Sequence, residues 1–119
     1  MLPAAARLRR STEFKAADRR GSRAGKPLVS GRLLIRPVAE PARIGFVVSR
    51  KVGSAVVRNR VRRQLRHLAR GHLTSLPGGS LLVLRANPRA ATARQEDLAA
   101  ELDLVIKALL RRQDKALCQ

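Results

Sequence analysis

Residues 49–66 read SRKVGSAVVRNRVRRQLR, and this stretch decides how the chain folds. Its first residues end an apolar segment, and Gly53 with Ser54 predicts a turn into a helix that the Ser54 side chain caps. At 100° per residue, four apolar side chains of this helix fall within about 80° of one another, which is typical of a core-facing stripe. The stripe consists of Val57, Val61, Leu65 and Leu68.

Arginine dominates the rest of this helix. Residues 55–70 contain six arginines and no acidic residue. Like charges four residues apart cost about 0.2–0.5 kcal/mol per pair, and arginines in the first turn oppose the helix dipole. We therefore expect the arginine face to bind a polyanion. The side chains that point most directly away from the apolar stripe are Asn59, Arg63, Arg66 and Arg70.

The whole chain is strongly basic, with 26 Lys and Arg against 8 Asp and Glu and a formal net charge of +18 over 119 residues. Such a charge is best tolerated when a polyanion is the normal partner. No stretch approaches the roughly 18 consecutive apolar residues of a membrane span, and the first residues lack the apolar run of a secretory signal. Cys118 is the only cysteine, which excludes an internal disulfide and favours the reducing cytoplasm. We expect a cytoplasmic protein that binds nucleic acid rather than a membrane.

Two further helices are predicted on either side of this region. Ser11 is expected to cap a helix over residues 11–20, followed by a loop over residues 22–27, which are polar and contain Gly and Pro. Near the other end, Thr92 and Gln95 have the spacing of a capping box. The core-facing residues of the last helix, which is expected to end near Arg112, are Leu98, Leu102, Val105, Ile106 and Leu109.

Three segments predict strands, residues 28–36, 43–49 and 80–85, and Gly31 marks either a bulge or a break in the first. The resulting order is helix, two or three strands, helix, strand, helix. This order predicts an α+β fold, a single α/β sandwich with a small mixed sheet and three helices. We expect one RNA-binding domain over residues 1–119, with flexible ends at 1–8 and 113–119.

Residues 49–63 match the signature Ser-(Arg/Lys)-Lys-(Val/Ile)-Gly-x-Ala-Val-x-Arg-Asn-Arg-x-(Arg/Lys)-Arg, and with it the chain resembles the protein subunit of bacterial ribonuclease P. Further matches lie at residues 9–14 and 83–88, and the resemblance covers most of residues 7–112. It implies a fold with a left-handed β-α-β crossover around the arginine helix, whereas such crossovers are right-handed in about 98% of cases. It also implies a complex in which a catalytic RNA, through its Mg²⁺ ions, removes the 5′ leader from precursor tRNA.

The resemblance implies two groups of binding residues. One group would contact the RNA subunit and comprises Arg58, Asn59, Arg60, Arg62, Arg63 and Arg66, with Ser49, Arg50 and Lys51 at the strand end near the same surface. We add Arg70, which points to the same side of the helix, and expect one protein per RNA. The other group would hold the precursor tRNA leader in a cleft between the first helix and the sheet. Phe14 would line this cleft, but Asp18 stands where family members usually have a second aromatic residue, and Phe46 is expected to pack in the core. We therefore expect charge to hold the leader, with Arg19, Arg23, Lys26, Arg32 and Arg36 as candidates.

The acidic residues and histidines do not predict a catalytic centre in the protein. The acids are scattered along the chain, and His67 and His72 are five residues apart, a poor spacing for one metal on a helix. We therefore expect no catalytic residue and no metal ligand in the protein. A structural RNA-binding protein of the ribosomal type is the alternative. A regulator that binds DNA would show a helix-turn-helix pair, and a protein nuclease would need an acid/base set, and the sequence indicates neither.

Overall fold

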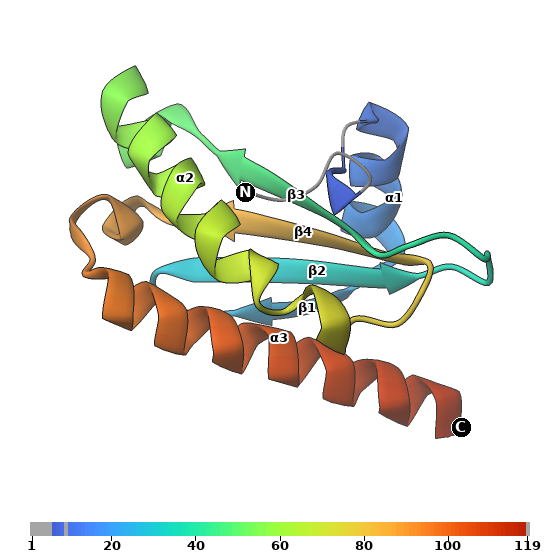
Figure 1. Cartoon of the computed structure of the whole chain (residues 1–119). Helices are drawn as coiled ribbons and strands as arrows, with labels where there is room; N and C mark the ends of the chain where they lie inside the picture. Colours follow the sequence, from blue (N-terminus) through green and yellow to red (C-terminus); the bar gives the residue numbers. More distant parts are fainter. Residues whose placement is uncertain (1–5, 9, 119) are drawn as a thin grey trace.

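The computed structural model describes residues 6–8 and 10–118, with side chains described as far as residue 112. A sheet lies between helices on its two faces (Figure 1). In chain order the elements are α1 (Ser11–Arg20), β1 (Ser22–Gly25), β2 (Val29–Ile35), β3 (Arg43–Val48), η2 (Arg50–Val52), α2 (Ala55–Arg70), η3 (Leu73–Ser75), β4 (Ser80–Ala86), η4 (Pro88–Thr92) and α3 (Gln95–Cys118), where η marks a short 3₁₀ helix. This order confirms the predicted α+β sandwich.

Strand β4 organises the sheet, because it lies between β2 and β3 in the order β1-β2-β4-β3. It pairs antiparallel with β2 and parallel with β3, while β1 pairs antiparallel with β2. Helix α2 connects the two parallel strands. In Figure 1 both strands point to the left, β4 lies below β3, and α2 passes in front of the sheet, which makes the crossover left-handed. The structure thus confirms the crossover that the resemblance implies.

Helices α2 and α3 bury their apolar stripes against one face of the sheet. In α2, Val61 and Leu65 are fully buried and Val57 and Leu68 are partly buried, as predicted. The residues predicted to face the core in α3 are all buried, namely Leu98, Leu102, Val105, Ile106 and Leu109. These side chains pack with residues of β2, β3 and β4 in one cluster. Because this cluster fixes the rotation of α2, the arginines of α2 face outward.

Gly31 lies in the middle of β2, where α3 comes too close for a side chain. It pairs regularly with Ala24 on one side and Leu84 on the other, so the predicted bulge or break is wrong. A Cβ atom at Gly31 would lie 3.0 Å from Val105 Cγ1 and 3.1 Å from Leu109 Cδ1. The glycine therefore allows the close approach of another element rather than a bend in the strand.

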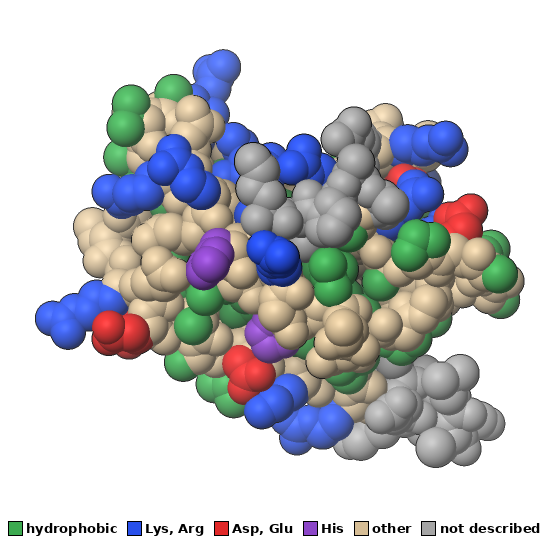
Figure 2. Space-filling model, viewed as in Figure 1, with side chains coloured by type: hydrophobic (Ala, Val, Ile, Leu, Met, Phe, Trp, Pro, Cys, Tyr) green, Lys and Arg blue, Asp and Glu red, His purple; other side chains and the backbone are tan. Residues whose placement is uncertain are grey.

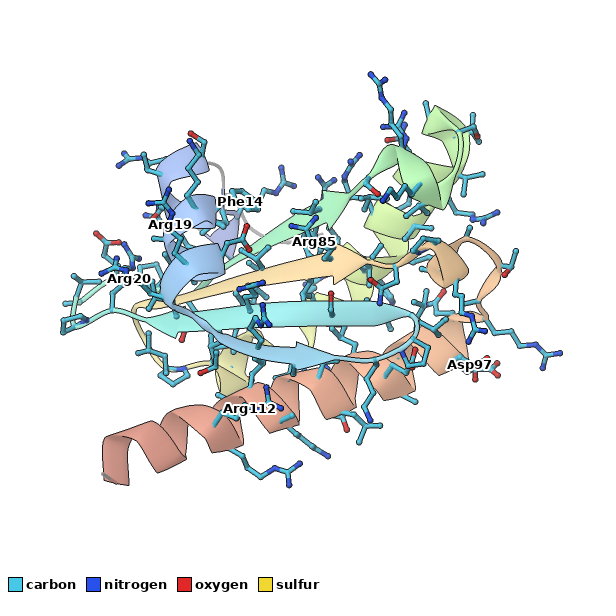
Figure 3. All side chains as sticks on the ribbon, turned by 180° about the vertical axis from the view of Figure 1, so that it is seen from behind. Phe14, Arg19, Arg20, Arg85, Asp97 and Arg112 are labelled. Atoms are coloured by element: carbon cyan, nitrogen blue, oxygen red, sulfur yellow. The ribbon has the colours of Figure 1, made fainter. Side chains whose placement is uncertain are left out.

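Helix α1 covers part of the opposite face. A second, smaller cluster joins Leu8 and Ala17 to Leu81 and Val83 of β4, with Phe14 packed against it. Since α1 is only 10 residues long, no helix of the described residues covers much of this face, as Figure 3 shows. The two faces of the sheet are thus covered to different extents.

Two predictions near α1 are wrong. Arg10, not Ser11, occupies the N-cap position, and its side chain makes no capping hydrogen bond. The expected loop at residues 22–27 contains strand β1, which pairs with β2 from Ser22 to Gly25. This strand is short, polar and at the edge of the sheet, with Ala24 as its one buried residue, so its sequence lacks the alternation that marks a strand.

The start and length of α3 also differ from the prediction. Thr92 lies in η4 and α3 begins at Gln95, so the two residues do not form a capping box. The helix also continues beyond Arg112 to Cys118. No helix within residues 6–8 and 10–118 is long and apolar enough to span a membrane.

Parts of the two ends have buried side chains or helical structure, and their flexibility stays a prediction. Ala6 and Leu8 are buried, and the Leu8 N–H donates to the Ile44 carbonyl of β3 at 3.0 Å. The end predicted at 113–119 coincides with the last turns of α3 as far as Cys118. Residues 1–5, 9 and 119 lie outside the described residues.

Glu13 ties α1 to the sheet. Its side chain is 12% exposed, and its carboxylate oxygens lie 3.5 Å from Arg36 Nη1 and 3.4 Å from Arg43 Nη1. Glu40 approaches the same two arginines at 3.2 and 3.9 Å. Because Glu13 and its partners are largely withdrawn from water, these pairs are screened less than pairs on the surface. The network anchors α1 where β2 ends and β3 begins.

We predict that Glu13→Gln lowers the free energy of unfolding by about 1–3 kcal/mol, because two partly buried guanidinium groups lose a charged partner. The matched control is Asp103→Asn, which removes the exposed pair between Asp103 and Lys107 on α3 and should cost less than about 0.5 kcal/mol. Urea denaturation measures both values. Equal losses in the two variants would contradict the anchoring role of Glu13.

Candidate nucleic-acid interface

The arginines of α2 form a basic surface on the outer side of the helix. The Ser54 hydroxyl accepts a hydrogen bond from the Val57 N–H at 3.4 Å, which confirms the predicted cap. Figure 2 shows Lys and Arg side chains gathered over α2. We call this surface the α2 basic face; its exposed members are Asn59, Arg60, Arg63 and Arg70, and its half-buried members are Arg58, Arg62 and Arg66.

Three side chains of the α2 basic face already have partners in the protein. The Arg60 guanidinium donates to the Ala91 carbonyl and so joins α2 to η4. Arg62 Nη1 donates to Asn59 Oδ1 at 3.0 Å. This bond occupies the Asn59 oxygen and leaves its amide N–H groups to donate outward. Arg60 therefore has a structural role in addition to the expected role in binding.

Two hollows lie beside the α2 basic face. The first, of about 450 Å³, is lined by Asn59, Arg62, Arg63, Arg66 and His67. The second, of about 320 Å³, lies at the β3 edge and is lined by Arg7, Leu8, Phe14, Ile44, Gly45, Phe46, Arg62 and Arg66. Because Arg62 and Arg66 line both hollows, the basic surface continues from α2 to the aromatic side chains beside β3.

The surroundings of Arg66 disfavour its positive charge. Burial lowers its pKa, and the neighbouring charges of Arg7 and Arg62 lower it further. Each of these causes disfavours the charged guanidinium in the free protein, and a bound anion would offset them. Arg7, which the sequence did not single out for binding, thus belongs to the same charged group.

Ser49, Arg50 and Lys51 lie exposed at the end of β3, where the chain turns into α2. Val52 is buried and holds η2 against the core. Gly53 follows with φ of 153°, in the region that favours glycine. This turn places the three polar residues next to the first turn of α2.

A second basic surface lies on the face of the sheet that α1 partly covers. Arg23 of β1 stands directly opposite Arg32 of β2, and Arg85 lies on the same face of β4, opposite Ser30. We call Arg23, Arg32 and Arg85 the sheet basic face; Figure 3 views it from the side of α1 and labels Arg85. Arg85 was missed in the sequence, although a single arginine that alternates with buried residues in β4 is a detectable signal.

The structure separates the five basic candidates for the leader cleft. Arg23 and Arg32 lie on the sheet basic face. Arg19 lines a shallow hollow on α1 with Thr12, Lys15, Ala16 and Arg20. Lys26 is exposed in the turn between β1 and β2, and Arg36 is held by Glu13 and Glu40. Arg19, Lys26 and Arg36 thus have surroundings that differ from those of Arg23 and Arg32.

Phe14 and Phe46 both line the hollow beside β3. Phe14 lies against the backbone of β3, where a Cβ atom on Gly45 would clash with Phe14 Cζ. Phe46 packs against the main core, as expected, and also lines this hollow. The structure therefore brings both aromatic side chains close to Arg62 and Arg66.

Within the described part of the chain, no three His, Cys, Asp or Glu side chains come together in a way that could hold a metal ion. His67 lies exposed beside the α2 basic face, and His72 is half-buried after the end of α2. The side chains that the structure brings together carry positive charge and donate hydrogen bonds. Both properties suit the binding of phosphate oxygens.

Comparisons with known proteins show the family to which the chain belongs. The family model described as Ribonuclease P matches residues 2–110. The ribonuclease P protein component of Nocardioides sp. is 55% identical over 113 residues, which cover 93% of this chain and 94% of the relative. The corresponding protein of Streptomyces avermitilis is 48% identical over 118 residues, which cover 92% and 96% of the two chains.

Solved structures share the fold at low sequence identity. The ribonuclease P protein of Staphylococcus aureus superposes with a TM-score of 0.78 at 22% identity, over 87% of this chain and 94% of that one. The protein of Thermotoga maritima gives a TM-score of 0.72 at 22% identity, over 88% and 96%. With the family match, these findings lead to one conclusion. The chain belongs to the ribonuclease P protein family, whose members are subunits of the ribonucleoprotein endonuclease ribonuclease P.

Proposed function

We propose that the α2 basic face binds the catalytic RNA of ribonuclease P, and that the sheet basic face binds the 5′ leader of precursor tRNA. Through both contacts the protein assists the endonucleolytic removal of the leader, which produces the mature 5′ end of the tRNA. One protein binds one RNA subunit, and the complex works in the cytoplasm.

The observation that carries this proposal is the presence of two basic surfaces on different sides of one sheet. The α2 basic face lies on the helix that covers one side, whereas Arg23, Arg32 and Arg85 lie on the other. The hollow at the β3 edge, with Arg62 and Arg66 at one wall and Phe14 at another, lies between them. Two surfaces allow the protein to hold two RNA segments at once.

The residues of the α2 basic face suit RNA backbone and groove edges. Guanidinium groups bind phosphate oxygens through two parallel hydrogen bonds, with little dependence on base sequence. The free N–H groups of the Asn59 amide can donate to a base edge or a 2′-hydroxyl. We expect this surface to recognise the shape and charge of a folded RNA.

We propose that the catalytic RNA, rather than the protein, binds the Mg²⁺ ions. The described residues gather no set of metal ligands, whereas phosphate oxygens are hard ligands that suit Mg²⁺. The protein contributes positive charge instead. Its formal net charge of +18 offsets the repulsion between the two RNA molecules, which added cations would otherwise screen. The protein should therefore matter most when magnesium is scarce.

The direct test is cleavage of precursor tRNA at low Mg²⁺ by the protein, by its cognate catalytic RNA, and by both together. We expect cleavage at the mature 5′ end only when both are present. If the RNA cuts equally well without the protein, a structural RNA-binding role replaces the proposed one. Cleavage by the protein alone would reveal an active site in the protein.

The affinity for the catalytic RNA should fall steeply with salt, because phosphate contacts release counterions. With about six contacts, the slope of log K against log salt concentration should be about −4 to −5. Arg63→Ala should make this slope shallower by about one. Arg112→Ala, which removes an exposed arginine of α3, is the matched control and should leave the slope unchanged; a flat salt dependence would contradict the proposed contacts.

Phe14→Leu tests whether a leader base stacks on the ring. Leucine keeps apolar packing against Leu81 and Val83 but removes the aromatic face, and stacking contributes about 1–3 kcal/mol per base. We expect weaker binding of leader-bearing tRNA and unchanged binding of mature tRNA, measured with the assembled ribonucleoprotein. Equal affinity of wild type and variant for leader-bearing tRNA would rule out stacking at Phe14.

A further inference from the structure

The stability of helix α1 does not explain why residue 18 is an aspartate. It lies in the last turn of α1, where the helix dipole disfavours a negative charge. The resemblance leads one to expect an aromatic side chain at this position. The surroundings of Asp18 on the sheet therefore have to account for it.

Those surroundings are two arginines of the sheet basic face. Asp18 Oδ1 lies 3.6 Å from Arg32 Nε, and Asp18 Oδ2 lies 4.0 Å from Arg85 Nη2. The two oxygens thus face different strands, β2 and β4. Through them Asp18 offsets the charge of a surface that otherwise presents three guanidinium groups.

Neither ion pair is built as a structural anchor. The three side chains are 31–48% exposed, and each pair is a single long contact rather than a bidentate one. Exposed pairs of this kind contribute little to folding. Glu13, which is 12% exposed and meets two arginines at 3.4 and 3.5 Å, already anchors the same helix.

The orientation of Arg32 does not depend on the Asp18 carboxylate. Arg32 Nη1 also donates to the main-chain carbonyl of Asp18. A substitution of the side chain leaves this carbonyl in place. The carboxylate is therefore expected to act through its charge, in competition with any anion that approaches Arg32 and Arg85.

We propose that the Asp18 carboxylate competes with the precursor tRNA leader for Arg32 and Arg85. The carboxylate pairs with both arginines until a leader phosphate displaces it. This inference rests on the proposed function of the sheet basic face. A phosphate can bind a guanidinium through two hydrogen bonds, so it replaces the loose carboxylate contacts with stronger ones. Asp18 thereby weakens leader binding and makes it selective for a backbone that reaches both arginines.

The test compares Asp18→Asn with Asp103→Asn in the ribonucleoprotein assembled with the catalytic RNA. The control makes the same chemical change at a residue of α3 with almost the same exposure, 41% against 40%. Affinities are measured for tRNA with and without the leader. Removal of a like charge a few ångströms from a phosphate should tighten leader-bearing tRNA by about 3- to 10-fold, with mature tRNA and the control unchanged.

A second variant tests whether the loss of the Asp18 carboxylate acts by freeing Arg85 to bind the leader. In an Arg85→Ala background, Asp18→Asn should give a smaller gain, because one of the two competed contacts is gone. Unchanged or weaker binding of leader-bearing tRNA by Asp18→Asn, with normal thermal unfolding, would overturn the proposal. If the wild-type complex does not distinguish tRNA with and without a leader, the assignment of this face to the leader fails, and the inference fails with it.

Discussion

The burial of the apolar stripe of α2 against the sheet is the interaction on which the rest of the structure depends. Val61, Leu65 and Ala69 are fully buried, and they hold in place a helix whose like charges disfavour it in isolation. This packing turns the arginines outward and sets the left-handed path from β3 to β4. Without it, the charge of residues 58–70 would have no fixed geometry.

The unequal coverage of the sheet determines where the second surface can form. Helices α2 and α3 close one face with a continuous core, whereas the short α1 leaves arginines of β1, β2 and β4 accessible on the other. Two acidic residues have different roles on this side of the sheet. Glu13 fixes α1 to the ends of two strands, and Asp18 moderates the charge of the surface that remains open.

Hydrophobic periodicity predicted the parts of the fold in which one face of an element is buried. The apolar stripes of α2 and α3 are of this kind. Strand β1 could not be predicted, because a polar edge strand buries only Ala24. The handedness of the crossover followed from the resemblance, since a local pattern does not encode which side of a strand its partner occupies. Arg19 and Arg36 carry the right charge, but only tertiary packing shows that Arg19 lines a hollow on α1 and that Arg36 pairs with Glu13 and Glu40.

Directed cleavage of RNA from two positions on the protein tests the central claim, the assignment of one RNA to each surface. In a Cys118→Ser background, a chelated iron probe is attached to a cysteine that replaces Arg63 or Arg23, and the protein is assembled with the catalytic RNA and precursor tRNA. We expect the probe at position 63 to cut the catalytic RNA and the probe at position 23 to cut the leader. Cleavage of the catalytic RNA alone from both positions would contradict this assignment.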